Sequence, residues 1–339
     1  MNDSETIWKL RTDKGILVHA LYADDFLHFS NNPELYAEFK MKIQKKFDIK
    51  TGEVDNYLGN RITLNGQEGT IRLDQEAYLD EVLKKFNMDN CTPVKTPMEE
   101  RLSESNRGQT LSKEDQAKYR MIVGSLLYLA CWSRPDISFA VSELSRFVSS
   151  AGEVQMKAAQ RVLRYLKGTK ELGLQYTKTC DQTNLLWGFV DSDWAGCLDT
   201  RKSTSGYVLM FNGCAISWKS KRQSVVALSS AEAEFMAASS LVQEVIAVRK
   251  LLEKLGIPQR DPTVIGEDNR TCIAWSEGSV GGSDRAKHID LRKHFLHEAV
   301  QASHIKLEPV RSSDNLADLF TKPLPKSSFE SLRNRIMGL

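Results

Sequence analysis

The stretch that most constrains the fold is "LLWGFVDSD", residues 185–193, an unbroken apolar run that ends in acidic residues. A strand that is apolar on both faces is typical of the centre of a sheet covered on both sides. Such a strand needs neighbouring strands and covering layers, so this half of the chain is predicted to be an α/β domain. Asp191 lies near the carboxyl end of the strand, where α/β sheets usually carry functional groups.

The segments that follow supply the rest of such a domain. Residues 205–221 are predicted to form a hairpin that turns at Asn212-Gly213, a strong two-residue turn signal. A long helix over residues 231–256 comes next, and a strand, two helices, a strand and a last helix from about Asn315 complete the series. The predicted order is β-β-β-α-β-α-α-β-α.

The first half of the chain has a different pattern. Residues 15–30 are predicted to form a hairpin with Asp24 and Asp25 at its tip. Residues 99–116 are polar and lack periodicity, which predicts a surface linker, and residues 117–168 have helical periodicity throughout. At 339 residues, two or three domains are expected. The predicted divisions are 1–72, 73–173, 174–325 and a C-terminal helix or tail at 326–339.

Charge and cysteine content exclude some classes of protein. The net charge is only +2, so any basic surface for nucleic acid must be local. The six cysteines include no C-x-x-C pair, which favours a reducing compartment and neither a disulfide framework nor a zinc site. His294 and His297 have no acidic or cysteine partner at ligand spacing. Without a signal core or a long apolar run, we expect a soluble intracellular protein.

Two nearby glutamates of the long helix, Glu232 and Glu234, are predicted to have different roles because they lie on different faces of the helix. Ser229 and Glu232 fit a capping box, in which Glu232 reaches back to the N-cap, and Glu232 falls on a mostly solvated stripe. Glu234 instead lies in line with Leu241 and Val245, which must face the sheet. A buried carboxylate is costly unless a cation or a donor compensates it. Helix capping accounts for the presence of Glu232, whereas Glu234 has no such structural role and is a candidate functional residue.

Two further acids complete a candidate site. Asp268 ends the strand after the long helix, and Asp318 lies in the first turns of the last helix. Turn capping is an alternative role for Asp191 and Asp268, and helix-dipole stabilisation is one for Asp318. If these acids and Glu234 converge, two divalent cations about 3.5–4 Å apart would compensate their charge. Oxygen ligands favour Mg²⁺ or Mn²⁺, and such a pair suits hydrolysis of a phosphodiester.

A series of short motifs points to a known family. The chain contains, in this order, "LYADD", "YLGNRI", "VKTPM", "VLRYLKGT", "VDSDWAG", "KSTSGYVLMF", "ISWKSKRQ", "SSAEAEF", "EDN", "KHIDLRKHF" and "NLADLFTKPL". In this series it resembles the C-terminal part of the Pol polyprotein of copia-type LTR retrotransposons. The resemblance implies a partial reverse transcriptase palm and thumb, a helical connection and a ribonuclease H-like mixed-sheet α/β domain.

The resemblance also implies roles for particular residues. The metal ligands of ribonuclease H match Asp191, Glu234, Asp268 and Asp318. "YADD" resembles the polymerase hairpin whose tip binds the catalytic magnesium ions, so Asp24 and Asp25 are metal-ligand positions by descent. Without that context, an Asp-Asp turn is more often an ordinary solvated turn.

Two departures from the family limit the expected activity. Only 23 residues precede Asp24, and their acids follow no apolar strand, so polymerase activity is not expected from this chain alone. The loop "VRSSDN" lacks the histidine that helps product release in many members of the wider fold, so slow turnover is expected. His288 is a candidate substitute, although a surface histidine is the favoured interpretation.

Contacts to a phosphate backbone need lysine, arginine and small polar donors. The candidates near the proposed site are Lys219, Lys221, Arg222, Arg285, Lys287, His288, Ser203, Thr204 and Ser205. A solvated basic face is the alternative for the charged ones. The three hydroxyl residues suit a phosphate or a ribose 2′-hydroxyl, the group that distinguishes RNA from DNA. The resemblance adds a primer-grip segment at Tyr57, which could equally be core, and a thumb helix at 76–86.

The leading hypothesis is therefore an endonuclease that uses two Mg²⁺ or Mn²⁺ ions to cut the RNA strand of an RNA–DNA hybrid. Its other expected partners are the integrase and polymerase fingers of the full element. We expect it in cytoplasmic virus-like particles or in the nucleus. No membrane partner and no zinc ion are expected. One alternative is an inactive transposon remnant that at most binds nucleic acid. Another is a truncated gene model of a complete RNA-directed DNA polymerase polyprotein.

Overall fold

The computed structural model describes residues 6–178, 186–278 and 287–339, and its central element is a five-stranded sheet. The strand order is β10-β9-β8-β11-β12, so the apolar strand β8 is central, as predicted. β9 and β10 form the antiparallel hairpin, while β11 is parallel to both β8 and β12. The predicted mixed-sheet α/β class is confirmed. The strands are β8 (Leu186–Asp193), β9 (Thr204–Phe211), β10 (Cys214–Arg222), β11 (Thr263–Glu267) and β12 (Ile305–Pro309).

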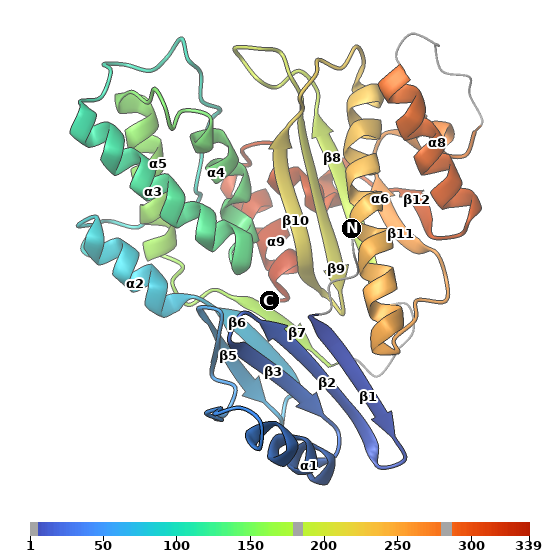
Figure 1. The fold of residues 1–339 in the computed structure, drawn as a ribbon. Coiled ribbons are helices and arrows are strands. Elements are labelled where there is room, and N and C mark those ends of the chain that lie inside the picture. Colours follow the sequence, from blue (N-terminus) through green and yellow to red (C-terminus); the bar gives the residue numbers. More distant parts are fainter. Residues whose placement is uncertain (1–5, 179–185, 279–286) are drawn as a thin grey trace.

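Helices α6 and α8 lie on one side of this central sheet (Figure 1), and α7 packs with them against β11 and β12. The helical stripe that was predicted to face the sheet does so, since Leu241 and Val245 are fully buried in one cluster with Val190 of β8. Of the helices in the described ranges, none is both long and apolar enough to cross a bilayer. The covering helices are α6 (Ser230–Leu255), α7 (Arg270–Ser276) and α8 (Lys287–Gln301).

The opposite face packs against the C-terminal segment and a helical block. Phe320 and Ile336 of the C-terminal segment share one hydrophobic cluster with Val208 of β9 and Leu126 of the block. One continuous core therefore joins the sheet to the block, and α9 (Lys326–Met337) contacts both (Figure 1). The helical block consists of α2 (Glu76–Lys85), α3 (Lys113–Trp132), the 3₁₀ helix η1 (Pro135–Ile137), α4 (Ser138–Ser145) and α5 (Glu153–Lys167).

Two smaller sheets lie at the N-terminal end. In the first, β2 and β3 form the predicted hairpin, and its turn places Ala23 at a φ of 49°. In the second, β7 pairs with β6, so the residues just after the predicted division at 173/174 belong to an N-terminal sheet. The domain limits stay predictions. The elements are β1 (Ile7–Thr12), β2 (Gly15–Tyr22), β3 (Asp25–Ser30), α1 (Pro33–Gln44), β4 (Asn56–Tyr57), β5 (Asn60–Asn65), β6 (Thr70–Asp74) and β7 (Leu174–Thr177).

The prediction of a surface linker at residues 99–116 is wrong for its first part. Leu102 is 5% exposed and belongs to the core of the helical block. Ser103 is 7% exposed and donates a hydrogen bond to Asp199 at 2.6 Å. Polar composition was misleading because buried polar side chains are tolerated when they have partners, and these partners come from distant segments.

The predicted last helix also differs. In place of one helix from about Asn315, the chain forms two 3₁₀ helices, η2 (Ser312–Asp314) and η3 (Leu316–Phe320), and α9 begins only at Lys326. Pro323 and Pro325 explain the interruption, because proline lacks an N–H and restricts the residue before it.

A fully buried ion pair fixes the helical block internally. Arg134 and Asp136 are 2% and 1% exposed, and their closest atoms, Nη2 and Oδ2, are 2.7 Å apart. Tyr165 donates to the same carboxylate at 2.5 Å, and Arg134 donates to the Thr169 carbonyl at 2.9 Å. These contacts connect η1 to the end of α5.

We expect Asp136→Ala to lower the free energy of unfolding by about 3–5 kcal/mol, because it leaves the Arg134 charge buried without a partner. Urea denaturation followed by circular dichroism measures the change. Glu38→Ala is the matched control, because Glu38 forms an exposed ion pair with Lys14 and its loss should leave the transition nearly unchanged. Equal effects of the two substitutions would contradict the prediction.

Candidate metal centre

Three acidic side chains converge at the carboxyl end of the central strands. Asp191, Glu234 and Asp268 each offer one carboxylate oxygen, and these atoms lie within 4.8 Å of one another. Asp191 comes from β8, Asp268 follows β11 directly, and Glu234 lies in the second turn of α6. Since β8 and β11 are parallel neighbours, their carboxyl ends meet at one edge of the sheet. Within the described ranges this is the only such group of three or more potential ligands.

Asp318 faces this group from η3 and lies near Asp191, but it is not one of the three acids whose oxygens meet. The Lys322 ammonium lies 2.8 Å from Asp318 Oδ1 and 3.8 Å from Asp191 Oδ2, and so lies close to both carboxylates. The side-chain amide of Asn315, the N-cap of η3, donates to the Val190 carbonyl at 2.8 Å. That bond holds η3 beside the residue that precedes Asp191. The four predicted acids therefore share one region, with three in direct proximity.

Burial dominates the electrostatics of the site. Asp191 and Glu234 are 3% and 5% exposed. Burial raises the pKa of Asp191 to about 7, with Lys322 opposing the shift and Asp318 adding to it. Burial also raises the pKa of Glu234, and the negative charges of Glu267 and Asp191 raise it further. These carboxyls resist ionisation unless positive charge is added.

Glu267 is a member of the site that the sequence analysis missed. It is fully buried, its Oε1 accepts a hydrogen bond from the Asn269 N–H at 2.9 Å, and burial raises its pKa to about 8. Its charge also raises the pKa of Glu234. The available signal was the acidic pair Glu267-Asp268 at the end of a strand. Alternation places two successive side chains on opposite faces but does not say which face is buried.

The donor set fits a divalent cation. Oε2 of Glu234 and Oε2 of Glu267 are buried oxygens without a hydrogen-bond partner. Buried polar atoms are usually satisfied, so orphaned carboxylate oxygens beside other carboxylates indicate a missing positive charge. Carboxylate oxygens are the ligands that Mg²⁺ and Mn²⁺ prefer. Asp191 is also held in place, since Thr321 Oγ1 donates to its Oδ2.

Glu232 has the capping role that was predicted, with two differences. Ser229 is the N-cap and accepts a hydrogen bond from the Glu232 N–H at 3.2 Å, but the Glu232 carboxylate accepts from the Leu228 N–H rather than from Ser229. Glu232 is also only 8% exposed, so its place on a solvated stripe was wrong. The loop before α6 folds over the first turn and covers the side chain.

Several basic candidates gather around a small cavity next to α6. Its volume is about 150 Å³, and it includes Met236 and Ser240, which follow Glu234 on α6. The charged and hydroxyl side chains along it include Ser205, Lys219, Lys221, Arg222 and Arg292. A concave basic surface with hydroxyl donors suits a phosphate group.

Other nucleic-acid candidates are placed differently. Ser203 is fully buried and its hydroxyl accepts a hydrogen bond from the Ala195 N–H at 3.1 Å. Thr204 is 2% exposed and accepts from Arg101 at 3.4 Å, so both hydroxyls have partners in the interior, and their contact with nucleic acid stays a prediction. Arg285 lies outside the residues that the structure describes, as do the side chains of Lys287 and His288.

Asp24 and Asp25 lie at the exposed tip of the β2–β3 hairpin and are separate from the metal-centre candidates. The hairpin approaches the predicted primer-grip segment, since burial raises the pKa of Tyr57 and the Asp25 charge adds to the shift. In the part of the chain that the structure describes, no third acid, histidine or cysteine completes a ligand group with the two aspartates.

Sequence comparisons give relatives for the whole chain. A family described as reverse transcriptase (RNA-dependent DNA polymerase) matches residues 4–100. The retrovirus-related Pol polyprotein from transposon TNT 1-94 of Nicotiana tabacum is 35% identical over 100% of this chain and 26% of its own length. The corresponding polyprotein from transposon RE1 of Arabidopsis thaliana is 36% identical over 98% of this chain and 22% of its own length. This chain therefore spans about a quarter of these polyproteins.

A shorter relative and two solved structures match parts of the chain. A putative transposon Ty5-1 protein of Saccharomyces cerevisiae is 32% identical over 69% of this chain and 75% of that protein. RNase H1 from Halobacterium salinarum NRC-1 covers 40% of this chain and 93% of its own, with 14% identity and a TM-score of 0.29. LC11-RNase H1, solved in complex with an RNA/DNA hybrid, covers the same shares with 10% identity and a TM-score of 0.31.

Without divalent cations, the stability of the protein should fall as the pH rises. The folded chain keeps a proton on Asp191 up to about pH 7, whereas an unfolded aspartate releases it near pH 4. This contribution is complete below about pH 4 and is lost between about pH 4 and 7, at about 1.4 kcal/mol per pH unit.

Urea denaturation in EDTA at pH 5, 6 and 7 tests this dependence. Asp191→Asn should give a flatter curve than the wild type because the titrating group is absent. Adding Mg²⁺ at pH 7 should stabilise the wild type more than the variant. Parallel pH curves for the two proteins would show that Asp191 does not titrate as stated.

Proposed function

Since this chain belongs to the family of copia-type retrotransposon Pol polyproteins, we propose that it is a metal-dependent nuclease that cuts the RNA strand of an RNA–DNA hybrid. The convergence of Asp191, Glu234 and Asp268 carries the proposal. These acids come from three separate elements, and a purely structural role would not leave Oε2 of Glu234 buried without a hydrogen-bond partner.

The residues present divide naturally between two cations. Asp191, Glu234 and Asp268 would hold one, and Asp191 with Asp318 would hold the other. Bound there, two divalent cations lower the pKa of an attacking water and stabilise the leaving oxygen of a phosphodiester. Lys322 lies close to both carboxylates that would hold the second cation, so its ammonium compensates part of their negative charge.

The side chains around the cations have distinct tasks. Thr321 keeps Asp191 oriented through its hydrogen bond to Oδ2, and Ser312 donates to Oδ2 of Asp268. Glu234 is held by the packing of α6 against the sheet, which also keeps bulk water from its carboxylate. Such fixed orientation favours catalysis, because little reorganisation is needed when the substrate binds.

The basic cavity beside α6 would orient the nucleic-acid duplex relative to the acidic side chains. Lys219, Lys221 and Arg222 along its wall would bind phosphates of the duplex and place one strand at the acidic side chains. Ser205 in the same cavity is the remaining hydroxyl candidate for contact with the ribose 2′-hydroxyl or a phosphate. We expect no polymerase activity from this chain by itself, because Asp24 and Asp25 have no third ligand among the described residues.

Glu234→Gln should reduce Mg²⁺-dependent cleavage of a labelled hybrid at least about a thousandfold, because loss of one metal ligand removes several kcal/mol of transition-state stabilisation. Glu232→Gln is the matched control on the same helix turn, and it should cost mainly helix stability. The initial rate of product formation at saturating Mg²⁺ is the measurement. Full cleavage by both variants would exclude the assignment, and hybrid binding without cleavage by the wild type would favour an inactive remnant.

Lys221→Ala should weaken hybrid binding and reduce the slope of log affinity against log salt concentration by about one. Fluorescence anisotropy with a labelled hybrid at several NaCl concentrations measures both quantities. Lys14→Ala is the control, because Lys14 lies in the turn between β1 and β2 and forms an exposed ion pair. An unchanged salt slope for Lys221→Ala would remove this residue from the proposed contact surface.

A further inference from the structure

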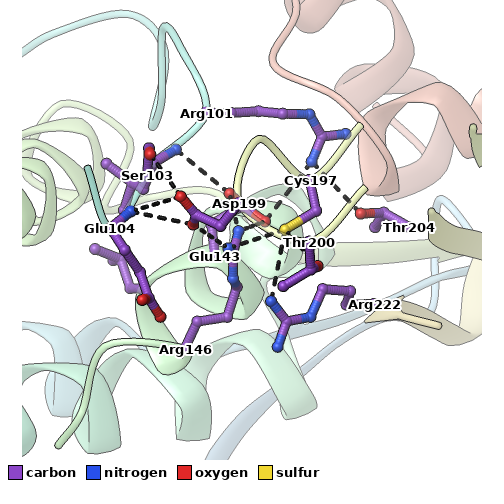
Figure 2. Close-up of polar contacts among 12 residues, drawn as sticks. Arg101, Ser103, Glu104, Glu143, Arg146, Cys197, Asp199, Thr200, Thr204 and Arg222 are labelled. Atoms are coloured by element: carbon purple, nitrogen blue, oxygen red, sulfur yellow. Dashed lines mark hydrogen bonds and ion pairs between the residues drawn. The ribbon is translucent and has the colours of Figure 1, made fainter. Parts of the chain in front are cut away.

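Arg101 crosses from the helical block to the candidate metal centre. It belongs to the segment that sequence analysis treated as linker, yet its side chain is only 10% exposed. Its Nη2 donates to Oδ2 of Asp193 and to the carbonyl of Thr321. Its Nη1 donates to Oγ1 of Thr204 at 3.4 Å (Figure 2). One guanidinium thus binds β8, β9 and the turn after η3.

The residues that Arg101 binds are next to the acids of the site. Asp193 is two residues after Asp191 on β8. Thr321 donates its hydroxyl to Asp191, and it lies between Asp318 and Lys322 in the chain. Arg101 therefore holds the two segments that carry Asp191 and Asp318 at a fixed separation. Asp318 also acts on Asp191 directly, since its negative charge adds to the raised pKa of Asp191, and Arg101 adds a connection between the segments that carry the two acids.

The helical block anchors Arg101 from the other side. The guanidinium carbon lies 5.0 Å from the centre of the Phe139 ring, and Nη1 lies 3.7 Å from Oε1 of Glu143. Aromatic stacking and charge together restrict the orientation of the guanidinium plane. Both residues lie on α4, so Arg101 transmits the position of α4 to the edge of the central sheet.

The same segment makes a second attachment to the loop after β8. Asp199 accepts hydrogen bonds from the Ser103 hydroxyl at 2.6 Å and from the Glu104 N–H at 3.0 Å, and Arg146 pairs with it at 3.1 Å (Figure 2). Gly196 in this loop allows the close approach, since a Cβ there would collide with the Asp193 carboxylate and lie 2.9 Å from Arg101 Nη2.

We propose that Arg101 is a positioning residue for the metal centre, which acts through Asp193 and Thr321 on the placement of Asp191 and Asp318. This inference rests on the proposed nuclease function. The planar guanidinium matters because it serves several acceptors at once, which a single ammonium group cannot do in the same geometry. The segment between α2 and α3 is accordingly part of the nuclease site.

The test uses the full 339-residue chain and measures Mn²⁺ affinity by electron paramagnetic resonance of the free ion, at a temperature where every variant is folded. Arg101→Met should weaken Mn²⁺ binding about 10- to 100-fold, the usual effect of losing a residue that orients metal ligands. Arg101→Lys should recover only part of the affinity. A merely structural role would lower the melting temperature and leave the affinity of the folded protein unchanged.

Arg107→Met is the matched control, because Arg107 lies in the same segment and donates to the carbonyls of Glu104 and Ser150. Its Mn²⁺ affinity should equal that of the wild type. Asp193→Asn is a second variant in case Arg101→Met fails to fold, and it should weaken Mn²⁺ binding in the same direction by removing the charge that Arg101 pairs with.

The outcomes separate this inference from the proposed function. Wild-type affinity in both Arg101→Met and Asp193→Asn, or in Asp193→Asn if Arg101→Met does not fold, would overturn the positioning role and leave the nuclease proposal intact. A wild type that binds Mn²⁺ but cleaves no hybrid would overturn the nuclease proposal, while the variants would still decide the role of Arg101. A wild type that binds no Mn²⁺ would contradict both.

Discussion

The burial of several carboxylates side by side, which costs solvation and adds mutual repulsion, is the constraint on which the rest of the structure depends. Asp191, Glu234 and Glu267 are at most 5% exposed, and Asp268 lies against the first two. Burial raises the pKa values of Asp191, Glu234 and Glu267, so the folded chain disfavours the ionisation of these three carboxyls. Stability alone would favour apolar residues at such positions. The arrangement makes physical sense if divalent cations complete it, with Lys322 providing part of the compensation beforehand.

The surrounding architecture keeps these charges together. α6 packs over one face of the sheet and presents Glu234 at its start, while η3 is tied to β8 through Asn315. The helical block is joined to the opposite face by a continuous apolar core. Arg101 extends this connection to the acidic side chains themselves. The candidate metal centre therefore depends on packing between segments that are more than 200 residues apart.

Much of the fold could be predicted from the sequence because it follows from local patterns of apolar and turn-forming residues. The apolar run of β8 predicted its central position, and the Asn212-Gly213 turn predicted the β9–β10 hairpin. The 3.6-residue period of α6 correctly placed Glu234 on the buried face, whereas Glu232 is buried as well and its carboxylate accepts from Leu228 instead of the predicted Ser229. The YADD hairpin was equally local, since β2 and β3 are joined by a tight turn. The prolines just before α9 were a local signal of a helix break, and the prediction of one continuous last helix did not take them into account.

The sequence by itself determined the strand at the centre, the face of α6 that is buried, and the acids available at the sheet edge. Only the tertiary structure decided which neighbours these acids have. It buried Glu267, gave Asp318 a lysine partner, turned Ser203 and Thr204 inward, and made Arg101 part of the site. The physical reason is that periodicity reports the direction of a side chain relative to its own element. Burial and pairing depend on segments that the chain brings together only when it folds.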